Sequence, residues 1–384
     1  MHIAFLTPEY PHVKTGAAGG IGTSIKNLAE SLVALGHTVR ILVYGQKRDI
    51  VFEENGIVIQ QIKNVKIKGL SWYFTRKKLQ GIIDDLYDKQ LLDIVEAPDW
   101  TGITSFVQPK KCPIVIRLNG SDTYFCHLDQ RPVKWWNRFH EKRALQKANG
   151  HISVSRFTAD KTNELFGLQI PFTIIPNGIN PEKFRPDTTL KKVSHTILYF
   201  GTLIRKKGLL ELPLIFNEVV AKNPNAQLIL VGRDASDIAT GSSSTWHLMQ
   251  QLFTPEALKQ VNYLGGVPYE AVRAHIAQAS VCVFPTFAEA LPVSWLEAMA
   301  MEKAIVASTI GWGPEVIDSG KDGILVNPKE HEAYSKAILD LLENETLNAT
   351  FGQNAARKIR AFFANDLIAE QSVAFYQTVI DKKK

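Results

Sequence analysis

Strand-like runs of apolar residues alternate with helical patterns along the chain, and the alternation starts twice. The first series opens with HIAFLT at 2–7, a helical pattern at 25–36 and HTVRILVYG at 37–45. Further strand-like runs of this series lie at 113–120, 150–155 and 172–178. The second series comprises 196–201, 227–232, 261–267, 280–285, 303–308 and 323–328. This alternation is typical of βαβ units and predicts two parallel sheets in an α/β protein.

The length of 384 residues agrees with two domains. A polar stretch with two prolines and several charges at 181–192 indicates the linker between them. We therefore predict a first domain over 1–187 and a second over 193–365. The remaining residues, 366–384, are expected to form a helix that reaches back to the first domain.

Composition narrows the class of protein. Hydrophobic residues make up 45% and charged residues 21% of the chain, which is ordinary globular usage and argues against a disordered or fibrous chain. No apolar run has the roughly 18 to 20 residues needed to cross a bilayer. The three cysteines, Cys112, Cys126 and Cys282, are too few and too far apart for a disulfide framework or a zinc knuckle. We expect a protein of the reducing cytoplasm.

The net charge of +6 comes from a basic excess in the first half of the chain. Cations and aromatics are interleaved in KNVKIKGLSWYFTRKK at 63–78 and KWWNRFHEKR at 134–143. Two interpretations stay open: a peripheral surface for an anionic membrane, or helices whose rings enter the core while the cations face water. The core interpretation is favoured for Trp135 and Trp136. No recognisable nucleic-acid-binding module accompanies the charge, so nucleic acid is not an expected partner.

The loop after the first strand is rich in glycine and ends at an N-cap candidate, Thr23 or Ser24. It is not a dinucleotide fingerprint, because Ile25 stands where the third glycine of G-x-G-x-x-G belongs. The amides of Gly19 and Gly20 could approach a phosphate or sugar oxygen at a helix start. The alternative is that these glycines only turn the chain.

A second constellation lies in VCVFPTFAEALPVSWLEAMAM, where a strand is followed by a helix. Pro292 suits the first turn of that helix, Glu289 lies just before it and Glu297 lies more than a turn inside it. Amides at the helix start would suit a diphosphate, and the two acids would suit sugar and ribose hydroxyls. In the alternative, Glu289 only favours the positive helix end and Glu297 is a solvated surface residue.

A third element, YFGTLIRKKG, places Arg205, Lys206 and Lys207 after another strand. Cations at the carboxyl edge of a sheet would neutralise a departing diphosphate. The alternative is a solvated basic turn.

Together these segments resemble the family 4 retaining glycosyltransferases, of the glycosyl transferases group 1 and the GT-B fold. The acids Glu289 and Glu297 match the family's pair of glutamates separated by seven residues. The other matching segments are GGIGTSIKNLAESLVALGHTV near the N-terminus, PNGI at 176–179, KKG at 206–208, NYLGGVPYEAV at 262–272 and GWGPEVIDSGKDGILVNP at 311–328.

The resemblance implies two Rossmann-like domains that face each other across a cleft, with a nucleotide-diphosphate-sugar donor on the second and an acceptor on the first. Glu289 would hold donor sugar hydroxyls, Glu297 the ribose and Lys207 the diphosphate. The further donor-binding residues expected on this basis are Gly20, Thr202, Gly266, Val267, Ala290, Leu291, Pro292 and Val293. The expected acceptor-side residues are Gly19, Asp99 and Asp122.

Two positions depart from the family pattern. Thr202 stands where members often have arginine, and Arg205 is the candidate to supply that charge. Asn119 stands where many members have histidine; it can hydrogen-bond but cannot act as a base.

The resemblance further implies transfer with retention of configuration, and neither a metal nor another cofactor is expected. The acceptor would be a glycan, a lipid-linked molecule or a small molecule of cell-surface polysaccharide or glycolipid biosynthesis. A nucleotide-sugar-binding protein without transfer activity, or an epimerase or phosphorylase on the same scaffold, is the alternative.

Overall fold

The computed structural model describes residues 1–16, 19–186 and 189–383, and these residues form two compact units. Unit 1 contains Met1–Gly178 together with Ala364–Lys384, and unit 2 contains Ile179–Phe363. The chain thus leaves unit 1 at Gly178, before the predicted boundary at residue 187, which lies outside the described residues. It returns at Ala364, close to the start of the predicted C-terminal helix.

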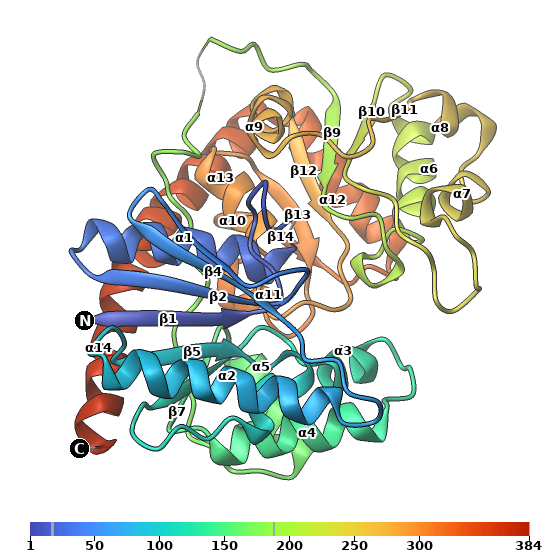
Figure 1. The fold of residues 1–384 in the computed structure, drawn as a ribbon. Helices are drawn as coiled ribbons and strands as arrows, with labels where there is room; N and C mark the ends of the chain where they lie inside the picture. Colours follow the sequence, from blue (N-terminus) through green and yellow to red (C-terminus); the bar gives the residue numbers. More distant parts are fainter. Residues whose placement is uncertain (17–18, 187–188, 384) are drawn as a thin grey trace. The chain divides into compact units, whose positions relative to one another are not determined.

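Unit 1 is built on a sheet that has eight strands among the described residues, in the order β3-β4-β2-β1-β5-β6-β7-β8 (Figure 1). Its strands are β1 (His2–Thr7), β2 (Thr38–Gln46), β3 (Ile50–Glu54), β4 (Ile57–Lys63), β5 (Ile94–Pro98), β6 (Ile114–Leu118), β7 (Gly150–Ser153) and β8 (Thr173–Ile174). Its helices are α1 (Gly20–Ala34), α2 (Ser71–Asp88), the 3₁₀ segment η1 (Trp100–Phe106), α3 (Asp122–Leu128), α4 (Trp135–Lys147), α5 (Arg156–Phe166) and α14 (Asn365–Lys383).

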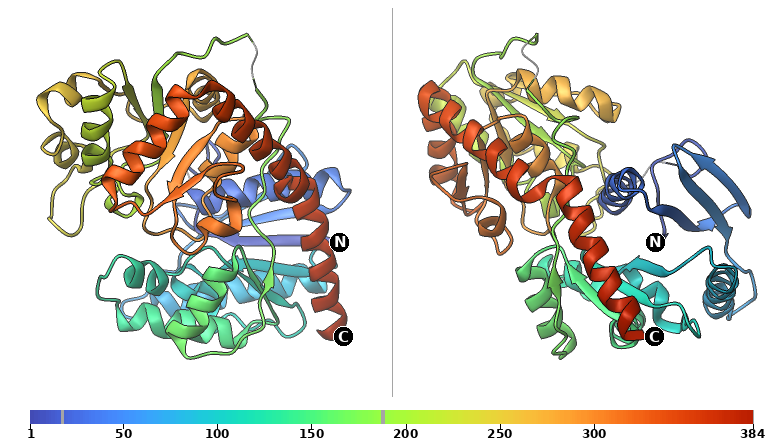
Figure 2. Two further views of the ribbon diagram at one scale, coloured as in Figure 1. Left: turned by 180° about the vertical axis from the view of Figure 1, so that it is seen from behind. Right: turned by 90° about the vertical axis from the view of Figure 1, so that its left-hand side faces the viewer.

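Alternate residues of the central strand β1 enter two cores. Ile3 and Phe5 pack on one face with residues of α1 and α14, whereas Ala4 and Leu6 face α2, η1, α4 and α5. The helix α14, dark red in Figure 2, therefore belongs to the core of unit 1, where Ile368 and Tyr376 are fully buried.

Unit 2 is built on a parallel sheet that has six strands among the described residues, in the order β11-β10-β9-β12-β13-β14. Its strands are β9 (Thr196–Phe200), β10 (Gln227–Val231), β11 (Val261–Tyr263), β12 (Val281–Phe284), β13 (Ile305–Ser308) and β14 (Ile324–Val326). Its helices are η2 (Arg205–Lys207), α6 (Leu212–Lys222), α7 (Thr245–Gln250), α8 (Pro255–Lys259), α9 (Tyr269–Gln278), α10 (Val293–Ala300), α11 (Gly313–Val316), α12 (His331–Glu343), α13 (Glu345–Lys358) and the π-helical turn η3 (Ile359–Phe363).

The predicted α/β class with two domains is confirmed, and three local expectations are wrong. The sheet of unit 1 is mixed, because the edge strand β3 pairs antiparallel with β4. The helix α1 begins at Gly20 with Gly19 as N-cap, before the predicted cap at Thr23 or Ser24. Trp135 and Trp136 are exposed rather than buried in the core.

Among the described residues, no helix combines the length and the apolar character that spanning a bilayer requires.

Candidate functional site

Unit 2 carries a lysine–glutamate pair at one edge of its sheet. Lys207 ends η2, which follows β9, and Glu289 lies in the loop that follows β12. β9 and β12 are parallel neighbours, so their carboxyl ends reach the same edge. The Nζ atom of Lys207 lies 3.0 Å from Oε1 of Glu289. The structure thus brings together two of the predicted catalytic residues.

Backbone contacts fix the two loops that carry this pair. The amides of Phe287 and Ala288 both donate to the carbonyl of Lys206, at 2.9 and 3.1 Å. Gly208 adopts a positive φ of 73°, and a Cβ there would lie 1.7 Å from the carbonyl oxygen of Pro285. Only glycine fits this close approach, which explains the glycine at the end of the KKG segment.

The two charges of the pair support each other. Burial opposes protonation of Lys207, but Glu289, with smaller contributions from Tyr199 and Glu297, outweighs it and raises the lysine pKa. Burial likewise opposes ionisation of Glu289, but the ammonium groups of Lys207 and Lys206 together outweigh it and lower the pKa of the carboxyl group. Both groups are therefore charged at neutral pH.

Glu297 lies on α10 and is buried, which contradicts its interpretation as a solvated surface residue. Burial raises the pKa of its carboxyl group to about 7, against the hydrogen bond that the Tyr269 hydroxyl donates to Oε1. Tyr269 begins α9 and was not among the predicted site residues. Its place in the segment 262–272, which carries part of the family likeness, was the available signal.

The start of α10 differs slightly from the expectation. Pro292 is the N-cap, the helix begins at Val293, and the preceding Ala290 and Leu291 are buried. The other predicted donor-side residues of this unit, Gly266 and Val267, lie in the loop between β11 and α9. A Cβ on Gly266 would lie 2.7 Å from the Cγ atom of Arg233, so this loop lies against the loop that follows β10.

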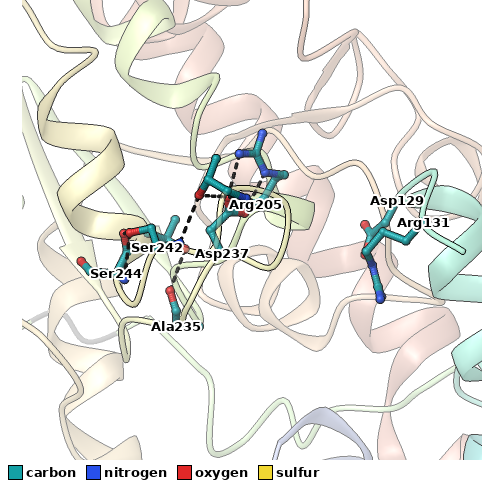
Figure 3. Close-up of polar contacts among 9 residues, drawn as sticks. Asp129, Arg131, Arg205, Ala235, Asp237, Ser242 and Ser244 are labelled. Carbon is teal, nitrogen blue, oxygen red and sulfur yellow. Dashed lines mark hydrogen bonds and ion pairs between the residues drawn. The ribbon is translucent and has the colours of Figure 1, made fainter.

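Arg205 is engaged by an aspartate that the sequence did not indicate. Its Nε and Nη2 atoms donate to the two carboxylate oxygens of Asp237, at 2.7 and 2.8 Å (Figure 3). Asp237 is 2% exposed and also accepts the amide and hydroxyl of Thr240. These bonds, that from Arg205 first, lower the pKa of Asp237 to about 2. Thr202, by contrast, is exposed and its carbonyl accepts from Tyr199.

In unit 1, Asp99 positions the segment that carries Asn119. Oδ1 of Asp99 accepts the amide of Asn119 at 2.9 Å, and burial raises the pKa of this aspartate to about 7. The Asn119 side chain donates to the carbonyl of Arg117 at 3.3 Å. Asn119 also lines a pocket of unit 1 together with residues that include Glu96, Arg117 and Ser24.

Asp122 is the first residue of α3 and is held by α4. Its carboxylate accepts from the Asn137 side chain at 2.9 Å, and its amide donates to Glu141 at 2.9 Å. Glu141 is buried and also accepts the amides of Thr101 and Thr123. Glu141, a positioning residue, was missed because a lone glutamate in a basic helix gives no pattern.

At the start of α1, Glu9 takes the place expected for a bound oxygen. Oε1 of Glu9 accepts the amide of Gly22 at 3.0 Å, and a Cβ on Gly19 would lie 3.3 Å from the same atom. Gly19 and Gly20 are the N-cap and first residue of the helix. The carboxylate therefore neutralises the helix end to which these glycines belong.

Among the described residues, no three histidine, cysteine, aspartate or glutamate side chains are grouped as ligands of a metal ion.

Two family models match successive parts of the chain. Residues 18–183 match Glycosyltransferase Family 4, and residues 180–358 match Glycosyl transferases group 1. The fold and these matches define a glycosyltransferase with two α/β domains of the GT-B type. The chain belongs to the family 4, group 1 glycosyltransferases, as its motifs predicted.

Similar proteins support the same class. The alpha-monoglucosyldiacylglycerol synthase of Acholeplasma laidlawii is 23% identical, with 94% of each chain covered. Sucrose-phosphate synthase from Thermosynechococcus elongatus has a similar structure, with a TM-score of 0.79, 21% identity and complete coverage of both chains. Anabaena Alr3699/HepE in complex with UDP-glucose has a TM-score of 0.75 and 18% identity, with 98% of this chain and 99% of the other covered. At these identities the two structures show a shared fold.

Proposed function

We propose that this protein is a retaining, metal-independent glycosyltransferase. It would move a sugar from a UDP-sugar or GDP-sugar donor to a glycan, lipid-linked or small-molecule acceptor. The observation that carries the proposal is the ion pair of Lys207 and Glu289 at the edge of the unit 2 sheet.

The donor would bind to unit 2. Lys207 would neutralise the diphosphate, helped by backbone amides from Leu291 to Val293 at the positive end of α10. Glu289, oriented by Lys207, would accept hydrogen bonds from sugar hydroxyls. Glu297, held by Tyr269, would accept from the ribose diol. Such fixed charges and dipoles stabilise a leaving diphosphate in the way that a bound cation does elsewhere.

The acceptor would bind to unit 1 near Asn119 and Asp122. In the reaction, the bond from the anomeric carbon to the phosphate oxygen breaks, and a bond to the acceptor oxygen forms on the same face of the sugar. A neutral amide such as Asn119 cannot take the acceptor proton. That proton would pass to the departing phosphate oxygen.

Two features of similar proteins support this proposal. Anabaena HepE has been solved with UDP-glucose, and the Acholeplasma relative is a synthase of a glucosyl glycolipid. A glycolipid or cell-surface polysaccharide is therefore the favoured class of product. We further propose that the enzyme acts in the cytoplasm, where the three buried free thiols, Cys112, Cys126 and Cys282, would stay reduced.

A thermal-shift panel of UDP, GDP, ADP and their sugars tests the donor, because a ligand of the folded state raises the midpoint of unfolding. The stabilising nucleotide sugar is then used radiolabelled, with and without EDTA, in transfer to lipid and glycan acceptors. We expect transfer that survives EDTA and yields a product of unchanged anomeric configuration. Binding without transfer to any acceptor would favour the non-catalytic alternative, and failure of every nucleotide to bind would overturn the donor assignment.

A further inference from the structure

Large aromatic side chains are exposed where α2 and α4 begin. Trp135 is 71% exposed, Trp136 38%, Phe139 44% and Phe74 39%. We call these four residues the aromatic surface. Burial of such rings is favourable, so four exposed rings on two adjacent helices need an explanation that isolated surface rings do not.

Ring contacts hold the aromatic surface in place. The Trp136 ring contacts Trp135 at 5.0 Å, Phe139 at 5.9 Å and Trp72 at 5.2 Å between ring centroids. Trp72 belongs to the first turn of α2 and also contacts Phe106 at 5.4 Å. The contact between Trp72 and Trp136 joins the starts of α2 and α4, which lie side by side in Figure 1. The exposed rings therefore stand on a packed aromatic base.

The surroundings of the aromatic surface are cationic. The exposed basic residues of these two segments, 63–78 and 134–147, are Lys63, Lys66, Lys68, Lys77, Lys134, Arg138 and Lys147. The ranges 63–78 and 134–147 contain one acid, Glu141, and it is buried with its oxygens bonded to the backbone of η1 and α3. These segments therefore present cations to an anionic partner and contain no exposed carboxylate.

The starts of α2 and α4 both lack the residues that usually stabilise a helix N-terminus. Within the described residues, neither α2 nor α4 has a side-chain cap at its N-terminus or an acid in its first turn. The N-cap of α4 is Lys134, a cation at the positive end of a helix. An uncapped N-terminus and a cation beside it destabilise a helix. Departures from these local preferences are concentrated at functional sites. An anion bound at these helix starts would offset the unfavourable electrostatic energy of the helix N-termini.

We propose that the aromatic surface and its cations dock on a bilayer that contains anionic lipid. Indole rings prefer the boundary between headgroups and acyl chains, and lysines next to them attract anionic headgroups. A neutral glycan would instead require several carboxylates or amides to bond its hydroxyls. The exposed side chains of the two segments are mainly rings and cations, with the amides of Asn64 and Gln146 at their ends. The proposal goes beyond the transfer reaction and holds whichever sugar is moved.

Flotation with lipid vesicles tests this surface on the full-length protein. Vesicles of phosphatidylcholine alone are compared with vesicles that contain 30% phosphatidylglycerol, at roughly 50 and 500 mM NaCl, which bracket strong and weak screening. We expect wild-type protein to float with the anionic vesicles at low salt and to be released at high salt. The double variant W135S/W136S should lose at least about tenfold in the partition coefficient. Each of K134Q and K68Q should lose about fivefold.

Matched controls lie on unit 2. Phe362 is 61% exposed and Lys222 is exposed on α6, so F362S and K222Q should float like the wild-type protein. Circular dichroism and thermal unfolding establish that each variant is folded. If wild-type protein does not float, or W135S/W136S floats as well as F362S, the proposal is overturned. Equal flotation with neutral vesicles, or binding to a soluble polyanion that survives the loss of both indoles, would also overturn it.

Discussion

The Tyr269 hydroxyl donates a hydrogen bond to the Glu297 carboxylate, although the two residues belong to different helices of unit 2. The contact ties the start of α9 to the body of α10. It also orients the buried acid for which we propose a role in binding the donor ribose.

Glu297 should make stability depend on pH. Burial raises its pKa from 4.5 to about 7, so between these values the folded state binds more protons than the unfolded state. The contribution of Glu297 to the free energy of unfolding is therefore fully present below pH 4.5 and is lost as the pH rises through about 7. E297Q should be more stable than wild-type protein at pH 8, by up to about 3 kcal/mol, and should lose this advantage towards pH 5. Urea unfolding at the two pH values measures the difference, and parallel pH profiles would contradict the assignment.

Loss of the Lys207 ammonium group should abolish most turnover. K207A removes the charge that faces the diphosphate in the proposed mechanism, and kcat should fall by roughly 10²- to 10³-fold. E289A should show a comparable loss through the donor sugar. K222A, on an exposed lysine of the same unit, serves as control. Steady-state rates decide the matter, and near-normal turnover by both site variants would reject their roles.

Asp237 should stabilise the loop that holds Arg205. D237N keeps the shape but removes the charge that the guanidinium group meets, and it should lower the free energy of unfolding by about 1–2 kcal/mol at pH 7. The pKa of Asp237 is lowered, so this contribution is present above pH 3.8 and is lost as the pH falls through about 2. The deficit of D237N should accordingly shrink in acid. Denaturant titrations at pH 7 and pH 3 would disprove this if the deficit stayed constant.

The buried network around Arg117 should dominate the stability of unit 1. Arg117 donates to Glu96 at 2.8 Å and to Ser372 at 3.0 Å, while Tyr376 donates to the other oxygen of Glu96 at 2.6 Å. R117M leaves the Glu96 carboxylate buried without its partner, and we expect a loss of about 3–5 kcal/mol. Y376F removes one hydrogen bond and should cost about 1–2 kcal/mol. Comparable losses from both variants in denaturant titrations would contradict this ranking.

The fold class could be predicted from the sequence because the spacing of apolar residues that marks a strand or a helix is visible within each short segment. The strands β3, β4 and β5 were missed, and each miss has a physical reason. β3 is a largely exposed edge strand, and β4 contains glutamines at 60 and 61. β5 is entirely buried yet carries the polar Glu96, whose charge is matched by Arg117 from β6. Such a pairing across strands cannot be inferred from either segment alone.

The candidate site was predicted in part. Lys207, Glu289 and Glu297 stood out because they lie in motifs at strand ends. Their partners in the fold did not stand out, because Tyr269 on α9 and Asp237 in the loop after β10 lie far from Glu297 and Arg205 in the sequence and meet them only in the folded unit. The exposure of Trp135 was missed for a different reason: a tryptophan in a helix is usually buried, and only the packing of α2 against α4 reveals the exception.

The return of α14 to unit 1 fixes an order of events during synthesis. Ile368 and Tyr376 complete the core around Ile3 and Phe5, yet they leave the ribosome after all of unit 2. At about 5–20 residues per second, the first unit waits roughly ten seconds or more, with an open apolar face, for its last helix. Unit 2, whose chain is continuous, can close first, so a nascent chain stalled after Phe363 should be a target for chaperones.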